Sequence, residues 1–128
     1  SPNTVAYTGT HDNNTTRGWF ESLPENVSRA VRSYAAQVGA ASGDVAWDFL
    51  RLVWSSKAGL AIAPLQDLSN LGVEGRMNVP GVAKGNWGWR CTEEMLKPPI
   101  FERLRELTTN AGRMAEPKAE LQQQEALQ

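Results

Sequence analysis

Gly59-Leu60-Ala61-Ile62-Ala63 is a continuous apolar run of the length of a β-strand. An apolar run without alternation is typical of a strand buried on both faces, as in a parallel sheet covered by helices. Val5-Ala6-Tyr7-Thr8 predicts a second short strand, because β-branched and aromatic residues favour extended backbone and Gly9 ends the segment. We therefore expect both runs to be strands of a parallel α/β architecture.

Helices are predicted where apolar residues recur at helical spacing. The first begins near Ser22, which has the spacing of a capping box to Glu25. The second begins near residues 42–44, and the third follows Pro98-Pro99. The expected apolar faces are Val27, Ala30, Val31, Tyr34 and Val38 in the first, Ala46, Phe49, Leu50, Val53 and Trp54 in the second, and Ile100, Leu104, Leu107 and Ala111 in the third.

The remaining segments are expected to be loops and a tail. Residues 10–17 are a polar loop, residues 71–90 a structured loop rich in Gly, Asn and Trp, and residues 113–128 a polar, weakly ordered tail. Loops at the carboxyl ends of parallel strands carry the active sites of α/β proteins, so the polar runs after the two strands should share one face. Residues 1–112 have the pattern of about a quarter of a (β/α)8 barrel, which needs roughly 250 residues.

Composition narrows the class of function. The 128-residue chain has a formal net charge of −1, which offers no basic surface for nucleic acid or an anionic membrane. The single Cys91 and the single His11 exclude a disulfide framework and a Cys/His metal site, and no cofactor is expected. Neither a signal peptide nor a membrane-spanning run is visible, so we predict a cytoplasmic protein. Because Ser1 is not Met, we expect the chain to begin inside a longer polypeptide.

His11-Asp12 is the sharpest local candidate for chemistry. A carboxylate at the end of a strand can accept two hydrogen bonds from sugar hydroxyls, and when ionised it stabilises positive charge on an anomeric carbon. An imidazole beside it can donate to another hydroxyl. The alternative is structural, with Asp12 capping the loop and His11 satisfied within the fold, and spacing alone favours that alternative.

Other charged residues have more than one interpretation. Asp12 and Asp67 could form a catalytic dyad, since glycosidases use two carboxylates that flank the bond. Asp67 is also explained as an N-cap of a short turn at residues 68–70, which the sequence favours. Glu74 and Arg76 are expected to form an ion pair within the loop.

A second candidate stretch covers residues 76–90. Asn78 offers a donor and an acceptor, which suits vicinal hydroxyls. Trp87 and Trp89 are two residues apart, so in an extended segment they face the same side, and one could stack on a sugar ring. The alternative, which the pattern alone favours, is that both indoles plug the end of the core with Arg90 packed over them.

Four motifs occur in order along the chain: Tyr7-Thr8-Gly9-Thr10-His11-Asp12-Asn13, Pro64-Leu65-Gln66-Asp67-Leu68, Arg76-Met77-Asn78-Val79-Pro80-Gly81 and Gly85-Asn86-Trp87-Gly88-Trp89-Arg90. Together they resemble the C-terminal part of the 4-α-glucanotransferases, also called amylomaltases or disproportionating enzymes. Complete members of that family are (β/α)8 TIM barrels of the α-amylase-like group. The resemblance implies that residues 1–112 are the C-terminal part of such a barrel, about two βα units, incomplete on their own.

The resemblance also implies an activity: transfer of α-1,4-glucan segments to the 4-hydroxyl of an acceptor by a retaining double displacement. It assigns Asp12 the role of transition-state stabiliser and makes His11 and Asn78 substrate contacts, with Asn13 and Trp87 as further substrate-site loop residues. The nucleophile and the acid/base are implied to lie in an N-terminal part of the polypeptide outside this sequence. The chain alone is therefore expected to be inactive. The implied partners are maltooligosaccharides and that N-terminal part, and a plastid location is implied for a plant protein.

Three positions depart from the family pattern. Asn14 stands where an acidic residue is usual, Gly75 where Ala is commoner and Val82 where Thr is usual. None of them is Asp12, so the implied reaction class is unchanged. Two alternatives to an enzyme remain: a non-catalytic module that binds maltooligosaccharides, and a structural fragment whose apolar faces need partners.

Overall fold

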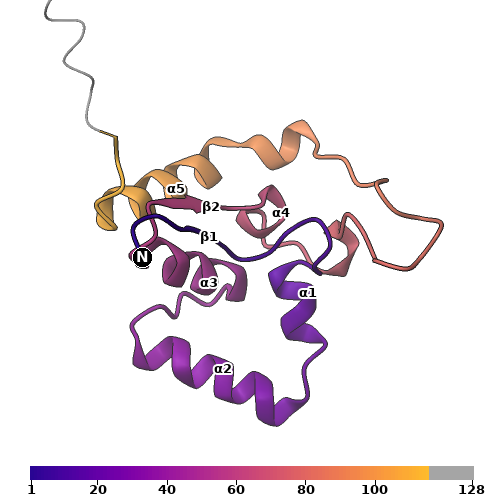
Figure 1. The fold of residues 1–128 in the computed structure, drawn as a ribbon, viewed down its shortest axis with the longest axis horizontal. Helices are drawn as coiled ribbons and strands as arrows, with labels where there is room; N and C mark the ends of the chain where they lie inside the picture. The colour runs from indigo at the N-terminus through magenta and orange to yellow at the C-terminus, as the bar shows by residue number, and fades with distance from the viewer. Residues whose placement is uncertain (116–128) are drawn as a thin grey trace, which may run out of the picture.

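A two-stranded parallel sheet lies at the centre of the molecule in the computed structural model, which describes residues 1–115 (Figure 1). β1 and β2 pair with Val5 opposite Leu60 and Tyr7 opposite Ile62. The elements in order are β1 (Val5–Tyr7), α1 (Thr16–Glu21), α2 (Glu25–Gln37), α3 (Val45–Trp54), β2 (Leu60–Ile62), α4 (Leu65–Leu68), the 3-10 turns η1 (Val73–Gly75) and η2 (Glu93–Leu96), and α5 (Pro98–Asn110). The predicted α/β fold with parallel strands is confirmed.

The core forms between α3, α4 and α5. Trp47, Leu50, Trp54 and Leu68 make up its buried cluster. Ile100, Leu104 and Leu107 of α5, and Ala111 directly after it, pack against this cluster, which confirms the apolar face predicted for that helix. Both buried indoles donate their N–H groups, as buried Trp side chains require: Trp47 to the carbonyl of Leu68 at 3.1 Å and Trp54 to Thr108 Oγ1 at 3.0 Å.

The start of the first helical region differs from the prediction. Helix α1 begins inside residues 10–17, where a loop was predicted, and Thr15 Oγ1 caps it by accepting from the N–H of Gly18 at 3.0 Å. The predicted capping box at Ser22 is wrong, because Ser22 ends α1 and its hydroxyl donates to the carbonyl of Trp19 at 2.6 Å. Helix α2 begins three residues later, without a side-chain cap.

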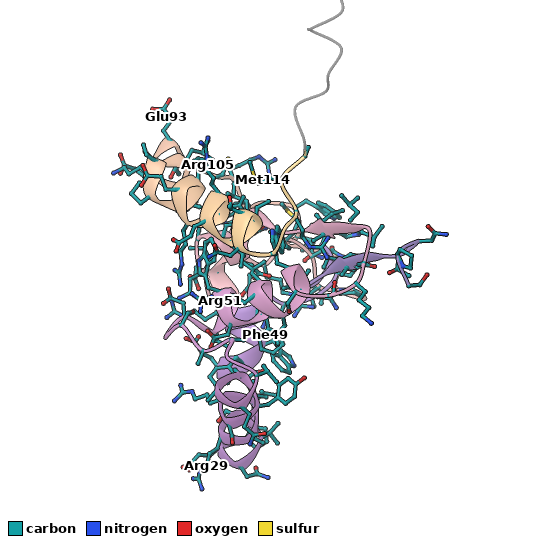
Figure 2. The ribbon with its side chains drawn as sticks, turned by 90° about the vertical axis from the view of Figure 1, so that its left-hand side faces the viewer. Arg29, Phe49, Arg51, Glu93, Arg105 and Met114 are labelled. Carbon is teal, nitrogen blue, oxygen red and sulfur yellow. The ribbon has the colours of Figure 1, made fainter. Side chains whose placement is uncertain are left out.

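Most residues of helix α2 are exposed in the part of the chain that the structure describes. Figure 2 shows it extending away from α5, with Arg29 at its far end. Of the predicted apolar face, Tyr34 is 57% exposed and Val38 48%, and Ala35 is the only buried residue of the helix. The helix is confirmed, and within residues 1–115 its predicted apolar face is largely exposed.

One face of the sheet also lacks a cover. Val5, Tyr7, Leu60 and Ile62 are each about half exposed, with fractions of 49, 50, 53 and 48%. Ala61 points the other way and packs against the core cluster, as the alternation of a strand requires. Burial of β2 on both faces was predicted, and within residues 1–115 it is found on one.

Two further predictions concern the C-terminal tail and membrane-spanning segments. Arg113, the first residue of the predicted tail, donates from its guanidinium to the carbonyls of Trp54, Ser56 and Ala58. Residues 116–128 of that tail lie outside the described residues. None of the helices in the part that the structure describes combines the length and hydropathy needed to cross a membrane.

The core predicts that two substitutions by alanine change the free energy of unfolding by very different amounts. Leu50 is fully buried at 0% exposed, so Leu50→Ala leaves a cavity and should lower the free energy of unfolding by about 2–5 kcal/mol. Val38→Ala removes an exposed side chain and should change it by less than about 0.5 kcal/mol. Urea unfolding followed by tryptophan fluorescence measures both. Equal losses for the two variants would contradict the position of Leu50 in the core.

Candidate functional site

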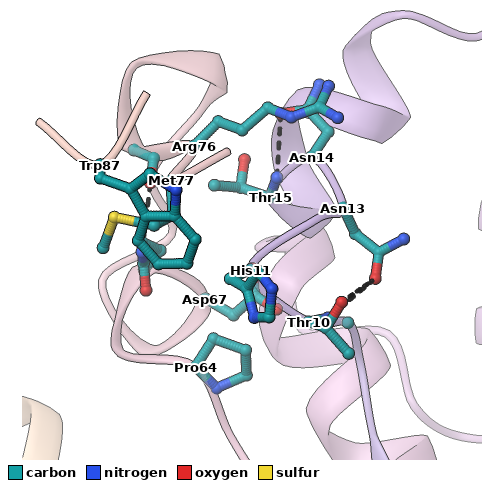
Figure 3. A pocket seen from close by; sticks show the side chains of 13 residues that line it. Thr10, His11, Asn13, Asn14, Thr15, Pro64, Asp67, Arg76, Met77 and Trp87 are labelled. Carbon is teal, nitrogen blue, oxygen red and sulfur yellow. Dashed lines mark hydrogen bonds between the residues drawn. The ribbon is translucent and has the colours of Figure 1, made fainter. Parts of the chain in front are cut away.

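The candidate site lies beyond the carboxyl end of the sheet, where the segments that follow β1 and β2 meet. A cavity of about 260 Å³ opens there, lined by side chains from segments 9–15, 64–67 and 75–77 and by Trp87 (Figure 3). Because the two strands are parallel, both segments emerge at the same edge of the sheet. The expectation that the polar runs after the strands share one face is confirmed.

Asp12 lies beside this cavity, and two of the predicted site residues contact its carboxylate. Asn78 Nδ2 donates to Asp12 Oδ1 at 2.7 Å, and His11 Nε2 lies 3.4 Å from the same oxygen. The side chain of Asp12 is 50% exposed and that of His11 56%. The amide of Asn78 therefore orients the carboxylate, the imidazole of His11 lies beside it, and the carboxylate is still open to further hydrogen bonds from a ligand.

Trp87 completes the cluster from a third segment. Figure 3 shows its indole beside the imidazole of His11, with 5.0 Å between the ring centroids. The backbone N–H of Trp87 donates to the carbonyl of Met77 at 2.8 Å, and the residue is 53% exposed. The cavity thus has a flat, accessible aromatic surface next to a carboxylate, an arrangement suited to a sugar ring with its hydroxyls.

The backbone at Trp87 explains why two sequence expectations are wrong. Its φ of +61° lies in the left-handed region, which is uncommon for a bulky residue, so the segment is not extended there. Arg90 donates to the carbonyls of Trp87 and Trp89 at 2.9 and 2.8 Å. The indole of Trp87 consequently faces solvent and does not plug the core. A strained backbone of this kind is often found at binding sites.

Asn13 shapes the loop that carries His11 and Asp12. Its Oδ1 accepts from the N–H and the hydroxyl of Thr10 at 2.8 and 3.1 Å, and its own N–H donates to the Thr10 carbonyl at 3.1 Å. In Figure 3 the side chain of Asn13 turns toward Thr10. A substrate contact by Asn13 stays a prediction.

Asp67 fixes the two ends of the same loop by hydrogen bonds. Its side chain is buried, with 3% exposed, and both oxygens accept hydrogen bonds. Thr8 Oγ1 donates to Oδ2 at 2.5 Å, and Thr16 donates its N–H to Oδ1 at 3.0 Å and its hydroxyl to Oδ2 at 2.8 Å. Asp67 therefore accepts from the first N–H of α1, and the prediction that it caps a turn at residues 68–70 is wrong. With both oxygens engaged by protein donors, its geometry argues against a dyad with Asp12.

The predicted ion pair between Glu74 and Arg76 is wrong as well. Glu74 accepts from the N–H of Gly72 at 2.8 Å. A hydrogen bond from the backbone N–H of Glu74 itself, and then the one from Gly72, lower the pKa of the Glu74 carboxyl from its ordinary value. Arg76 points to the site, where it donates to the carbonyls of Asp12 and Asn78, both at 2.9 Å.

The roles of Asp67 and Arg76 had no sequence signal that could have identified them. Their partners Thr16 and Asp12 are 51 and 64 residues away along the chain. Such contacts depend on which strands pair.

Within residues 1–115, no three His, Cys, Asp or Glu side chains gather closely enough to hold a metal ion.

The hydrogen bonds of Asp67 predict a loss of stability on substitution. In Asp67→Asn an amide N–H₂ replaces one acceptor and faces donors, so the free energy of unfolding should fall by about 1–3 kcal/mol. The matched control is Asp44→Asn, whose carboxylate forms a half-exposed ion pair with Arg103 and should contribute at most about 1 kcal/mol. Thermal unfolding followed by circular dichroism compares them. Similar losses in both variants would refute the structural role of Asp67.

The family model and the relatives that match this chain all belong to one family. Residues 1–96 match the family model described as 4-alpha-glucanotransferase. Over 87% of its length the chain is 45% identical to the 4-alpha-glucanotransferase of Synechocystis, and over 88% it is 37% identical to the chloroplastic/amyloplastic 4-alpha-glucanotransferase of Arabidopsis thaliana. It covers 22% and 20% of those two proteins.

A solved structure is similar over nearly the whole described chain. The amylomaltase from Streptococcus agalactiae, solved in complex with acarbose, superposes on 90% of this chain with a TM-score of 0.80 and 32% sequence identity. The superposed part is 23% of that protein. The chain thus spans about a fifth to a quarter of the length of the relatives it matches.

Proposed function

Because this chain belongs to the 4-α-glucanotransferase family, we propose that the complete protein transfers α-1,4-glucan segments to the 4-hydroxyl of an acceptor glucan or glucose. We propose further that this chain supplies the carboxylate that stabilises the transition state, on Asp12. The observation that carries the assignment is the half-exposed Asp12 carboxylate, which accepts a hydrogen bond from Asn78 and lies beside the imidazole of His11 and the exposed indole of Trp87.

The fold supports a place for residues 1–112 in a (β/α)8 barrel. In such barrels, bulky side chains of the strands fill the interior and the helices pack outside. The exposed side chains of Val5, Tyr7, Leu60 and Ile62 share one face of the sheet, opposite to the face that α3 and α5 cover. A barrel interior completed by the rest of the polypeptide would bury them, and it would pair the outer edges of β1 and β2.

The proposed chemistry is a retaining double displacement in which positive charge grows on the anomeric carbon. An ionised Asp12, held in place before the reaction, would stabilise that charge more strongly than water could. Asn78 orients the carboxylate, His11 would donate to a neighbouring sugar hydroxyl, and the indole of Trp87 would stack on a glucose ring. Retention needs a nucleophile and an acid/base with carboxyl groups roughly 5 Å apart. Since Asp67 is engaged with Thr8 and Thr16, we assign both roles to other parts of the polypeptide.

The assignment of Asp12 predicts a selective loss of turnover. In the full-length enzyme, Asp12→Asn keeps the shape but removes the charge, which should cost about 3 kcal/mol in the transition state, or roughly 100-fold in kcat. Glucose release from maltotriose measures kcat, and calorimetry with maltoheptaose should give nearly unchanged binding. Glu102→Gln, an exposed carboxylate on α5, is the control and should keep full turnover. Unchanged turnover of Asp12→Asn would refute the role.

Experiments on the isolated 128-residue chain separate the enzyme part from the alternatives. Without a nucleophile it should release no glucose from maltotriose, and measurable release would contradict the proposal.

Titration with maltoheptaose distinguishes a binding module, which would give a saturable heat, from a fragment that needs the rest of the barrel. The exposed sheet face favours the fragment, which should aggregate or bind a hydrophobic dye when expressed alone.

A further inference from the structure

Arg76 is a charged residue at the candidate site to which the proposed function assigns no role. It lines the cavity and is partly buried there. We propose that Arg76 is a positioning residue, which sets the place of Asp12 relative to Asn78 by binding the backbone of both. This inference rests on the proposed function, because it concerns how the carboxylate of Asp12 is held for that reaction.

The geometry that carries the proposal is a pair of bonds from one guanidinium group. Arg76 Nη2 donates to the carbonyl of Asp12 at 2.9 Å, and Arg76 Nε donates to the carbonyl of Asn78 at 2.9 Å. The donors of a guanidinium lie in one rigid plane, so the two carbonyls are held in a fixed relation. The side chains of these same two residues meet in the bond from Asn78 Nδ2 to Asp12 Oδ1 at 2.7 Å.

The loop around Asp12 needs such a support at its tip. Asp67 fixes the two ends of the loop through Thr8 and Thr16, but it does not reach Asp12. At the tip, where His11 and Asp12 are both exposed, the bonds that join the loop to segment 76–78 come from Arg76 and Asn78. The backbone bond from the N–H of Asn78 to the carbonyl of His11, at 3.1 Å, lies in the same group.

Loss of Arg76 should therefore affect turnover more than binding. A misplacement of a reacting group by about 1 Å can reduce the rate by roughly 100-fold. The ground-state contacts of a long glucan are spread over many residues and depend less on one carbonyl position. A lysine cannot replace Arg76, because an ammonium is a point charge on a flexible stem and does not present two donors in a fixed plane.

The test uses the full-length enzyme with Arg76→Ala and Arg76→Lys. We expect kcat on maltotriose to fall by roughly 10- to 100-fold in both, with KM changed by less than about threefold. Added guanidinium chloride at millimolar concentration should restore part of the kcat of Arg76→Ala, because it can reoccupy the site between the two carbonyls. It should not restore Asp12→Asn, which lacks the charge itself.

Arg113→Ala is the matched control. Arg113 also donates from its guanidinium to backbone carbonyls, those of Trp54, Ser56 and Ala58, and none of these is at the candidate site. Its replacement should lower the Tm while kcat per folded molecule stays unchanged. If Arg76→Ala does not fold, Arg76→Lys answers the same question.

Distinct results would overturn the inference. One is a kcat of either Arg76 variant that equals that of the Arg113→Ala control. Another is a rise in KM of more than tenfold at constant kcat, which would make Arg76 a substrate contact. If Asp12→Asn loses turnover and the Arg76 variants do not, only this inference fails. If Asp12→Asn also keeps turnover, the proposed function fails with it.

Discussion

The buried carboxylate of Asp67 is the interaction on which the site depends most. It joins Thr8 at the end of β1, Thr16 at the start of α1 and helix α4 after β2, so that one side chain connects three elements. A buried charge is costly unless its oxygens are satisfied, and hydrogen bonds to a charged group contribute about 1.5–3 kcal/mol each. The loop between Thr8 and Thr16 is thereby closed at both ends, and its tip is presented at the edge of the sheet.

The residues at the tip of this loop are both exposed to solvent and held in place by hydrogen bonds. Asp12 and His11 stay about half exposed, yet bonds from Asn78 and Arg76 limit their movement. Trp87 is exposed through a left-handed backbone that the bond to Met77 and the contacts of Arg90 maintain. In the proposed reaction, exposure would leave room for a sugar, and preorganisation would let the Asp12 carboxylate act on a charge that exists only in the transition state.

The apolar sheet face that remains exposed has an explanation in the length of the relatives. The chain spans 22% of the Synechocystis protein and 23% of the Streptococcus agalactiae amylomaltase. An apolar sheet face with two unpaired edges is unfavourable in water and matches a surface that further strands would cover. The proposed barrel accounts for Val5, Tyr7, Leu60 and Ile62 together, while the exposed face of α2 has no such simple counterpart.

Local patterns were sufficient for the strands, for α3 and α5, for the apolar face of α5 and for the placement of His11 and Asp12 after a strand, because period and turn chemistry act over a few residues. The face predicted for α3 was incomplete, since it did not include Trp47, which is 2% exposed and belongs to the core cluster. Helix α1 was missed since its six residues are too few for a period, and the capping box at Ser22 failed because that hydroxyl was already used by α1. The partners of Asp67 and Arg76 followed only from the folded chain. Parallel pairing of β1 with β2 brings together polar groups more than fifty residues apart, and no local pattern records which groups will meet.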